Sequence, residues 1–480
     1  MLLAIVIFYL VISIAIGLFA ARKVHSASDY ITAGRSLPMP MVMAMVFATW
    51  FGAETVLGIS ATFLDEGFRG LISDPLGAAI CLVLFGLVFA LPLYRLKLMT
   101  LGDFFHIRYN KNTELVLSAC IVLSYLGWVS AQVTALGLVF NVLSEGSVSM
   151  TQGMLIGAAV VLAYTLFGGM WSVAVTTCVQ MVIIVIGLVL VTSTASDMAG
   201  GMSSVLSKAA AEGKFEWLPA MDLVDMLSWM AALFTMALGS IPQQDVFQRV
   251  NTSKSESVAV WATTFGGIAY FVFAAVPLYL AYSASMIDPT QTELLMQQDS
   301  QLVLPTFVLT HMPFWLQAVF FGALLSVIMS TASSTLLAPS VTFTENVLKN
   351  FRPNMSDAEL LKATRVTVFF FTLLVVANAT LSSESIHGMV ENAYRITLAG
   401  VFVPLTAGLF WSRASNLGAA LSMSLGLGSW LVLEVFFPDI PFEPQLLGLL
   451  LSFIGMVAGS IISPNPHSAN RHGLAQVGPA

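Results

Sequence analysis

The chain has 480 residues, of which 57% are hydrophobic and only 9% are charged, and its formal net charge is −7. A soluble domain of this length cannot bury so much apolar surface, so the composition predicts an all-α, polytopic membrane protein in a lipid bilayer. No cluster of Lys and Arg suggests a nucleic acid partner. The three cysteines lie in apolar runs without metal-ligand spacing, so we expect buried, inert thiols. No nucleophile–base set is visible, so we expect no enzyme.

Runs of about 18 or more apolar residues predict thirteen membrane-spanning helices. They cover residues 2–20, 39–63, 72–94, 116–143, 150–168, 170–195, 226–248, 257–284, 303–345, 364–381, 390–412, 416–437 and 444–463. The ninth run is too long for one span, so we expect it to include a short outer helix at about 302–310. The transmembrane domain is then 1–463, and the polar segment 464–480 is expected to be a disordered cytoplasmic tail.

The Lys and Arg residues indicate how the chain is oriented in the membrane. Arg22 and Lys23 directly follow the first span, and the positive-inside rule places them in the cytoplasm, with the N-terminus outside. With alternating spans, most other Lys and Arg residues also fall in inner segments. The exceptions are Arg69, Lys208 and Lys214 in outer segments and Arg395 within a span. We therefore expect a multi-pass plasma-membrane protein with a cytoplasmic C-terminus.

The second span combines features that weaken a helix with a buried charge. Gly52 and Gly58 lower helix propensity, and Glu54 lies near the predicted midplane. A carboxylate at that depth is costly unless it is paired or hydrated, so Glu54 is a candidate substrate contact. The alternative is a structural carboxylate that is bonded to a neighbouring helix.

The region around the seventh span is also interrupted. The loop 196–225 before it is long enough for a short surface helix. Near the end of the span, Pro242 breaks the helical hydrogen-bond ladder, so nearby polar residues can line a cavity. Asp245 and Arg249 are four residues apart and could simply pair with each other, which is the structural explanation for both.

The ninth span contains a dense hydroxyl cluster at Met329–Thr335, with Ser326 one turn earlier. In a helix, Ser326, Ser330, Ser333 and Ser334 share one face. Uncharged hydroxyl oxygens at membrane depth can replace the water shell of a small cation, although many such hydroxyls only bond back to a backbone carbonyl. A broken helix facing a Ser/Thr-rich helix is typical of transporters with a midplane site, so we favour a cation site.

Several segments, in order along the chain, resemble the sodium/solute symporter family over essentially the full length. They are Asp29–Tyr30, Ala33–Ser36, Gly102–Phe105, Tyr164–Thr165, Gly168–Gly169, Gln244–Asp245, Gln248–Arg249 and Met329–Thr331. Within the family the chain is most similar to the high-affinity choline transporter branch. That similarity lies in Ala48–Trp50, Tyr164–Thr165, Gly168–Gly169, Ser172–Ala174, Gly239–Pro242 and Phe247–Val250.

The resemblance implies a leucine-transporter-like fold of five plus five helices. The inverted repeats would be spans 2–6 and 7–11, at about 39–195 and 226–412. It also implies sodium-coupled import of a small organic solute, with Na⁺ as the coupling ion and no other cofactor. The family's sodium site maps onto the backbone carbonyls of Ala48, Phe51 and Val327 and the hydroxyls of Ser330 and Thr331.

The chain departs from the family pattern at two sites. Some members bind a second sodium through an aspartate on the sixth span, where this chain has Thr177, while Ser333 and Ser334 are retained. We therefore expect one sodium per substrate. In the choline branch, aromatic rings cage the ammonium group. Trp50 and Trp128 match two of these rings, but Gln243 stands where another is expected, and Asp74–Ala79 lacks the expected tyrosine.

The predicted substrate-facing residues are Trp50, Glu54, Thr55, Trp128 and Gln243. They suggest an amine, a quaternary ammonium or an amino-acid-like solute. The alternatives are a symporter for a neutral or carboxylate solute, or a transporter-like membrane sensor without the attached kinase that such sensors carry. A channel would need a continuous polar pore, whereas the polar residues here gather near the midplane on two elements. No obligate protein partner is evident.

Overall fold

The computed structural model describes residues 1–219, 222–382, 384–437 and 439–464. Within these ranges the chain folds as helices and connecting loops, and one isolated β-bridge joins Leu37 to Ser253. The predicted tail lies outside the described residues from position 465 onward.

The first half of the chain contains ten α-helices and six shorter 3₁₀ or π-helical turns. The α-helices are α1 (Leu2–Ala20), α2 (Ala27–Thr32), α3 (Met39–Trp50), α4 (Ile59–Glu66), α5 (Ala78–Leu84), α6 (Ala90–Arg95), α7 (Leu101–Arg108), α8 (Lys111–Leu143), α9 (Met150–Met198) and α10 (Met202–Ala211). The turns are η1 (Ala21–Lys23), η2 (Ala33–Arg35), η3 (Glu54–Gly58), η4 (Gly67–Leu71), η5 (Ile72–Gly77) and η6 (Phe85–Phe89). The helix α10 confirms the short helix predicted within 196–225.

The second half contains the remaining elements. The α-helices are α11 (Leu223–Ala237), α12 (Gln244–Asn251), α13 (Glu256–Ile287), α14 (Pro289–Gln298), α15 (Val303–His311), α16 (Phe314–Thr342), α17 (Lys349–Phe351), α18 (Asp357–Leu381), α19 (Ile386–Gly400), α20 (Phe402–Phe410), α21 (Asn416–Phe436) and α22 (Pro444–Ile462). The turns are η7 (Ser300–Leu302) and η8 (Phe343–Leu348). The short helix predicted at about 302–310 is present as α15, separate from α16.

Nine helical segments in the described ranges are long and apolar enough to cross a membrane, or ten if the bent pair α19 and α20 counts as one span. The count differs from the predicted thirteen because some predicted spans are merged and others are broken. The segment Met150–Met198 covers two predicted spans, and the second and seventh predicted spans are each divided into shorter helices. The number thirteen therefore stays a prediction.

Gly169 marks the junction between the two predicted spans inside α9. Its backbone has φ 47° and ψ −136°, which is outside the helical region. A Cβ at this position would lie 2.4 Å from the backbone oxygen of Tyr30. Only glycine combines this backbone conformation with so close an approach of another segment.

The second and seventh predicted spans are broken where the sequence indicates. Helix α3 ends at Trp50, and Phe51 has φ −73° and ψ 75°, before η3 and α4 continue the segment. The backbone N–H of Ala53 lies in this break and donates to Oε1 of Gln132 on α8 at 3.1 Å. A turn that contains Pro242 separates α11 from α12, because proline cannot continue the ladder of N–H donors.

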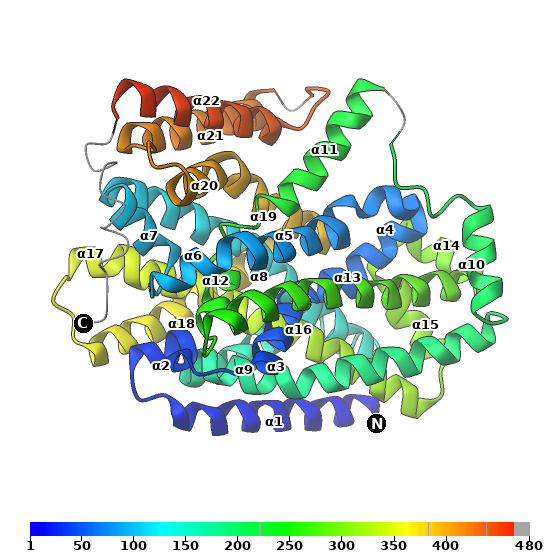
Figure 1. Cartoon of the computed structure of the whole chain (residues 1–480). Helices are drawn as coiled ribbons and strands as arrows, with labels where there is room; N and C mark the ends of the chain where they lie inside the picture. Colours follow the sequence, from blue (N-terminus) through cyan, green and yellow to red (C-terminus); the bar gives the residue numbers. More distant parts are fainter. Residues whose placement is uncertain (220–221, 383, 438, 465–480) are drawn as a thin grey trace.

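The long helices run side by side, and α16 lies among them (Figure 1). It packs against α1, α3, α8, α9 and α18, and almost every residue from Phe320 to Thr342 is buried. The pair α21 and α22 packs on the side of the molecule opposite α1 (Figure 1). The hydroxyl cluster of α16 is therefore in the interior of the helical bundle.

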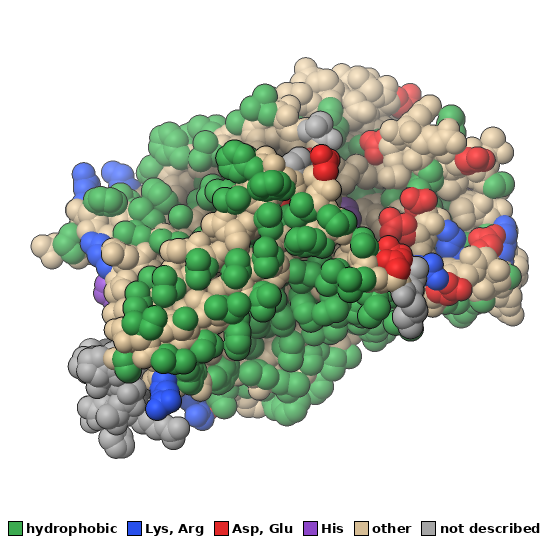
Figure 2. Space-filling model, turned by 90° about the horizontal axis from the view of Figure 1, so that it is seen from above, with side chains coloured by type: hydrophobic (Ala, Val, Ile, Leu, Met, Phe, Trp, Pro, Cys, Tyr) green, Lys and Arg blue, Asp and Glu red, His purple; other side chains and the backbone are tan. Residues whose placement is uncertain are grey.

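Large apolar side chains cover much of the outer surface (Figure 2). Exposed examples are Phe8 on α1, Val182 on α9, Phe370 on α18 and Ile461 on α22. Soluble monomers rarely expose apolar patches of this extent. Together with the apolar helices, this surface is that of a multi-pass membrane protein.

Candidate functional site

The break after α3 is held by a hydroxyl group from α16. Oγ1 of Thr331 donates to the backbone oxygen of Ala48 at 3.0 Å and lies 3.5 Å from that of Phe51. Gly52 permits this approach, because a Cβ there would lie 3.0 Å from Oγ1 of Thr331. Three of the five predicted sodium ligands are thus in direct contact.

The other two predicted ligands, Val327 and Ser330, precede Thr331 on the same helix α16. Oγ of Ser330 donates to the backbone oxygen of Val327 at 2.9 Å, and both residues are completely buried. We call Ala48, Phe51, Val327, Ser330 and Thr331 the hydroxyl junction. Its five oxygens are neutral, which is a donor set that suits a small monovalent cation such as Na⁺ and not a transition metal.

The residues considered for a second sodium are less closely connected. Oγ of Ser333 donates to the backbone oxygen of Ser330 at 3.1 Å. Oγ of Ser334 donates to that of Thr331 at 2.9 Å and accepts a hydrogen bond from Nη2 of Arg249. Thr177 is buried on α9, and among the described residues no hydrogen bond joins its side chain to either serine.

Three aromatic rings meet on the other side of the break. The ring centroids of Trp50 and Trp128 are 5.3 Å apart, and Tyr394 on α19 lies 5.3 Å from Trp50 and 5.5 Å from Trp128. We call these residues the aromatic cluster. Nε1 of Trp50 and the hydroxyl of Tyr394 are buried and have no hydrogen-bond partner among the described residues. Unpaired donors in a buried aromatic cluster are suited to a polar ligand.

Gln243 and Thr55 border this cluster. Nε2 of Gln243 donates to Oγ of Ser124 at 2.9 Å and to Oγ1 of Thr397 at 3.4 Å, while its Oε1 has no partner in the described part of the chain. Oγ1 of Thr55 donates to the backbone oxygen of Trp50 at 2.8 Å. The structure therefore places Thr55 beside Trp50 at the break, and Gln243 against α8 and α19, the helices that carry Trp128 and Tyr394.

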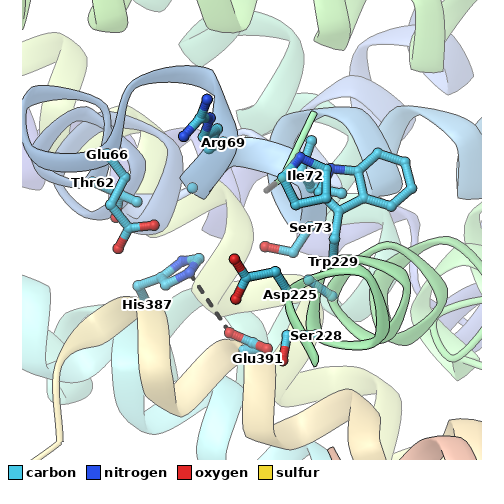
Figure 3. Close-up of a pocket in the computed structure, with 13 residues that line it drawn as sticks. Thr62, Glu66, Arg69, Ile72, Ser73, Asp225, Ser228, Trp229, His387 and Glu391 are labelled. Carbon is cyan, nitrogen blue, oxygen red and sulfur yellow. Dashed lines mark ion pairs between the residues drawn. The ribbon is translucent and has the colours of Figure 1, made fainter. Parts of the chain in front are cut away.

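Glu54 is paired with a histidine that sequence analysis did not select. Oε1 of Glu54 lies 2.9 Å from Nδ1 of His387 on α19, and only 4% of the Glu54 side chain is exposed. Nε2 of the same imidazole lies 3.8 Å from Oε2 of Glu391, one turn further along α19 (Figure 3). His387 thus lies between a buried carboxylate and a more exposed one.

A cavity of about 540 Å³ reaches His387, and we call it the vestibule. Its side chains include three carboxylates, from Glu66, Asp225 and Glu391, and one guanidinium, from Arg69 (Figure 3). Trp229 and Ser73 also line it. Acidic side chains gather toward one end of the face shown in Figure 2. A concave acidic surface raises the local concentration of cations.

Asp245 and Arg249 form a buried ion pair, as the structural explanation for them predicts. Nη1 of Arg249 lies 2.7 Å from Oδ2 of Asp245, and each side chain is 1% exposed. The hydroxyl of Tyr125 donates to the other oxygen of Asp245, and the ring of Tyr125 stacks on Trp128. Since Arg249 also donates to Ser334, this pair connects α12 with both α8 and α16.

Comparison with known proteins places the chain in a family. Residues 30–426 match the model described as the sodium:solute symporter family. The chain belongs to this family. This symporter is 29% identical to high affinity choline transporter 1 of Homo sapiens, over 89% of this chain and 75% of the relative. It is 25% identical to the sodium/glucose cotransporter of Vibrio parahaemolyticus, over 97% and 91% of the two chains. It is therefore a transporter and not an enzyme.

Solved structures show the same fold for this symporter. The substrate-bound, outward-open structure of a Na⁺-coupled sialic acid symporter matches with a TM-score of 0.82 at 19% identity, over 96% of this chain and 98% of the other. Mhp1, a nucleobase-cation-symport-1 family transporter, matches with a TM-score of 0.58 at 13% identity, over 94% and 99%. The resemblance to the family and to its choline transporter branch is confirmed.

The hydroxyl of Tyr270 on α13 lies 3.3 Å from Oγ1 of Thr55. Tyr394, His387 and Tyr270 are site residues that the sequence does not indicate. Each lies on a helix that contacts η3, at the break in the second predicted span. The spacing of His387 and Glu391, four residues apart, was the one local signal, since it places both on one helix face. Their proximity to Glu54 depends on tertiary packing.

Proposed function

We propose that this symporter uses the Na⁺ gradient to import a small organic solute that carries an amine or ammonium group. The observation that carries the proposal is the aromatic cluster, which lies beside Glu54 at the break that Thr331 binds. Indole and phenol rings attract ammonium groups through cation–π contacts. The similarity to choline transporters supports the same substrate class.

In this proposal the substrate is bound by Trp50, Glu54, Thr55, Trp128 and Gln243, with Tyr394 as a third ring. Na⁺ binds at the hydroxyl junction, where five neutral oxygens replace its water shell. We propose one Na⁺ per substrate, because Thr177 provides no carboxylate for a second ion near Ser333 and Ser334. Both sites share the break after α3, so occupation of one affects the geometry of the other.

The proposed topology has thirteen spans, with the N-terminus outside and the C-terminus in the cytoplasm of a plasma-membrane protein. The break at Gly169 supports two spans within α9. The distribution of Lys and Arg supports the orientation. We propose inverted repeats at about 39–195 and 226–412 within a transmembrane domain of 1–463. In this topology the vestibule opens to the outside.

A second candidate is a neutral or carboxylate solute. The observation in its favour is the contact between Glu54 and His387, because a protonated imidazole neutralises this carboxylate within the site. Relatives of this chain include the high-affinity proline transporter PutP of Bacillus subtilis, at 25% identity over 95% of this chain and 96% of that one.

Uptake into proteoliposomes distinguishes the two candidates. The panel consists of labelled amines, quaternary ammonium compounds, amino acids and carboxylates, each tested with and without an inward Na⁺ gradient. We expect Na⁺-dependent accumulation of an ammonium compound such as choline. Accumulation of simple carboxylates or sugars alone would contradict the proposed substrate class, and uptake that is independent of Na⁺ would contradict the coupling.

A further inference from the structure

Asp74 is a completely buried carboxylate that is not among the proposed substrate or sodium ligands. It lies in η5, and its side chain is 0% exposed. Oδ1 accepts a hydrogen bond from the hydroxyl of Tyr270, whereas Oδ2 has no partner among the described residues. Among the described residues, no backbone N–H donates a hydrogen bond to this carboxylate. Its hydrogen bonding within the protein is thus limited to the one bond from Tyr270.

Asp74 belongs to the same cluster of charges as Glu54. Its partner Tyr270 lies on α13, which also contacts η3, the turn that contains Glu54. The hydroxyl of Tyr270 also lies 3.3 Å from Oγ1 of Thr55, which in turn binds the backbone oxygen of Trp50. Asp74 is therefore linked through two hydroxyl groups to the aromatic cluster.

The charges in this cluster do not balance. Glu54 is matched by His387 at 2.9 Å, but the described residues include no basic side chain in contact with Asp74. When Glu54 and Asp74 are both ionised and His387 is protonated, the cluster has one net negative charge. A buried carboxylate without a cationic partner must either take up a proton or pair with a bound cation.

The surroundings favour a cation that enters from the vestibule. Ser73, the neighbour of Asp74, lines the vestibule together with His387. The other ionisable groups that line the vestibule are three acidic residues, Glu66, Asp225 and Glu391, and one basic residue, Arg69. The charge of Arg69 is already paired with Glu216. The ionisable lining of the vestibule is therefore mainly acidic, and Asp74 directly follows one of its lining residues in the chain.

We propose that Asp74 is the counter-ion of the transported ammonium group, while Glu54 stays paired with His387. This inference rests on the proposed function, because it assigns a further binding residue to the same substrate. The site then accepts one positive charge: the aromatic cluster covers the ammonium, and Asp74 neutralises it. Tyr270 fixes the carboxylate through Oδ1 and leaves Oδ2 for the ligand.

The test compares choline binding to the purified full-length protein at saturating Na⁺ among variants that differ in the charge of the cluster. Asp74→Asn removes the net negative charge, and we expect choline affinity to fall about tenfold or more. His387→Gln adds one net negative charge, so choline affinity should be unchanged or higher. The double variant Asp74→Asn/His387→Gln restores the original net charge and should recover affinity to within about threefold of the wild type.

The control ligand is the uncharged isostere of choline, in which carbon replaces the ammonium nitrogen. Its binding should not follow the charge series. Equal choline affinity of Asp74→Asn and wild type, or a double variant without recovery, would overturn the role of Asp74. If Asp74→Asn fails to fold, the choline affinity of His387→Gln is compared with that of the wild type. A lower affinity of His387→Gln would then overturn the role of Asp74.

Failure of the proposed function gives a different result. In that case wild-type protein binds neither choline nor any other ammonium compound of the uptake panel at saturating Na⁺, and the inference falls with it. Wild-type binding of choline that Asp74→Asn leaves unchanged would refute the inference alone.

Discussion

The hydroxyl junction and the cluster of Glu54, Asp74 and His387 lie on two sides of one helix break, but they differ in charge. In the hydroxyl junction every donor is neutral, and the two hydroxyls of Ser330 and Thr331 are hydrogen-bonded to backbone oxygens. In the second cluster the groups are ionisable, and Oδ2 of Asp74 is unpaired in the described part of the chain.

This difference indicates which ligand each side can hold. Neutral oxygens suit a small ion that exchanges its water shell for protein ligands at little electrostatic cost. An unmatched buried charge is costly until a group of opposite charge arrives, so it suits a substrate that brings its own positive charge. If the two sides are separable, a substitution on one side changes the binding of one ligand only.

The largest effect is expected for Asp245 and Arg249, whose opposite charges neutralise each other inside the protein. Arg249→Met leaves Asp245 buried without its cation and should destabilise the fold by about 3–5 kcal/mol. Thermal unfolding of the detergent-purified protein measures this effect. Arg249→Met/Asp245→Asn should recover part of the loss, and stable Arg249→Met protein would show that the pair is not structural.

On the sodium side, Thr331→Ala removes one oxygen that binds the broken helix. We expect the Na⁺ concentration for half-maximal uptake to rise about tenfold or more, and Ser330→Ala to shift it in the same direction. Thr335→Ala is a matched control, because its hydroxyl bonds only to backbone oxygens of its own helix, at Thr331 and Ala332. Wild-type Na⁺ dependence in both Thr331→Ala and Ser330→Ala would show that the sodium site lies elsewhere.

On the substrate side, Glu54→Gln should weaken substrate affinity about five- to tenfold and leave Na⁺ binding unchanged. The reason is that the uncharged amide no longer offsets His387, so the imidazolium repels an ammonium group. Competition binding at saturating Na⁺ provides the measurement. Unfolded Glu54→Gln protein would show that Glu54 has a structural role, and folded Glu54→Gln protein that transports a simple carboxylate normally would show that the substrate is not a cation.

The smallest effect is expected for Tyr394→Phe, which keeps the ring and removes only an unpaired hydroxyl. Substrate affinity should stay within about twofold of the wild type, because the ring supplies the cation–π contact. Tyr394→Leu is the comparison variant, since it removes the ring and should weaken binding clearly more. Equal affinities of the Phe and Leu variants would show that the ring of Tyr394 does not contact the substrate.

Sequence patterns predicted much of this arrangement, because they depend on local chemistry. Glycine at position 52 and proline at position 242 indicated both broken helices, and the density of hydroxyls around Ser330 indicated the helix that contacts the first break. The pairing of Asp245 with Arg249 followed from their spacing of four residues.

The remaining features depend on packing between distant segments. Glu54 meets His387 across 333 positions of sequence, and Asp74 meets Tyr270 across 196. No local periodicity encodes such contacts, so the sequence alone does not indicate a binding role for Asp74. The number of spans is also ambiguous, because α9 contains two apolar runs on either side of the non-helical Gly169, whereas the single apolar run 39–63 is divided at Phe51.

The coupling ratio tests the central claim, that one neutral sodium site and one charged substrate site share the break. Reversal potentials measured in proteoliposomes, with choline and with its uncharged isostere, give the charge moved per transported molecule. We expect one Na⁺ per substrate, and one elementary charge more for choline than for the isostere. A ratio of two Na⁺ per substrate, or equal charge movement for the two compounds, would contradict the account.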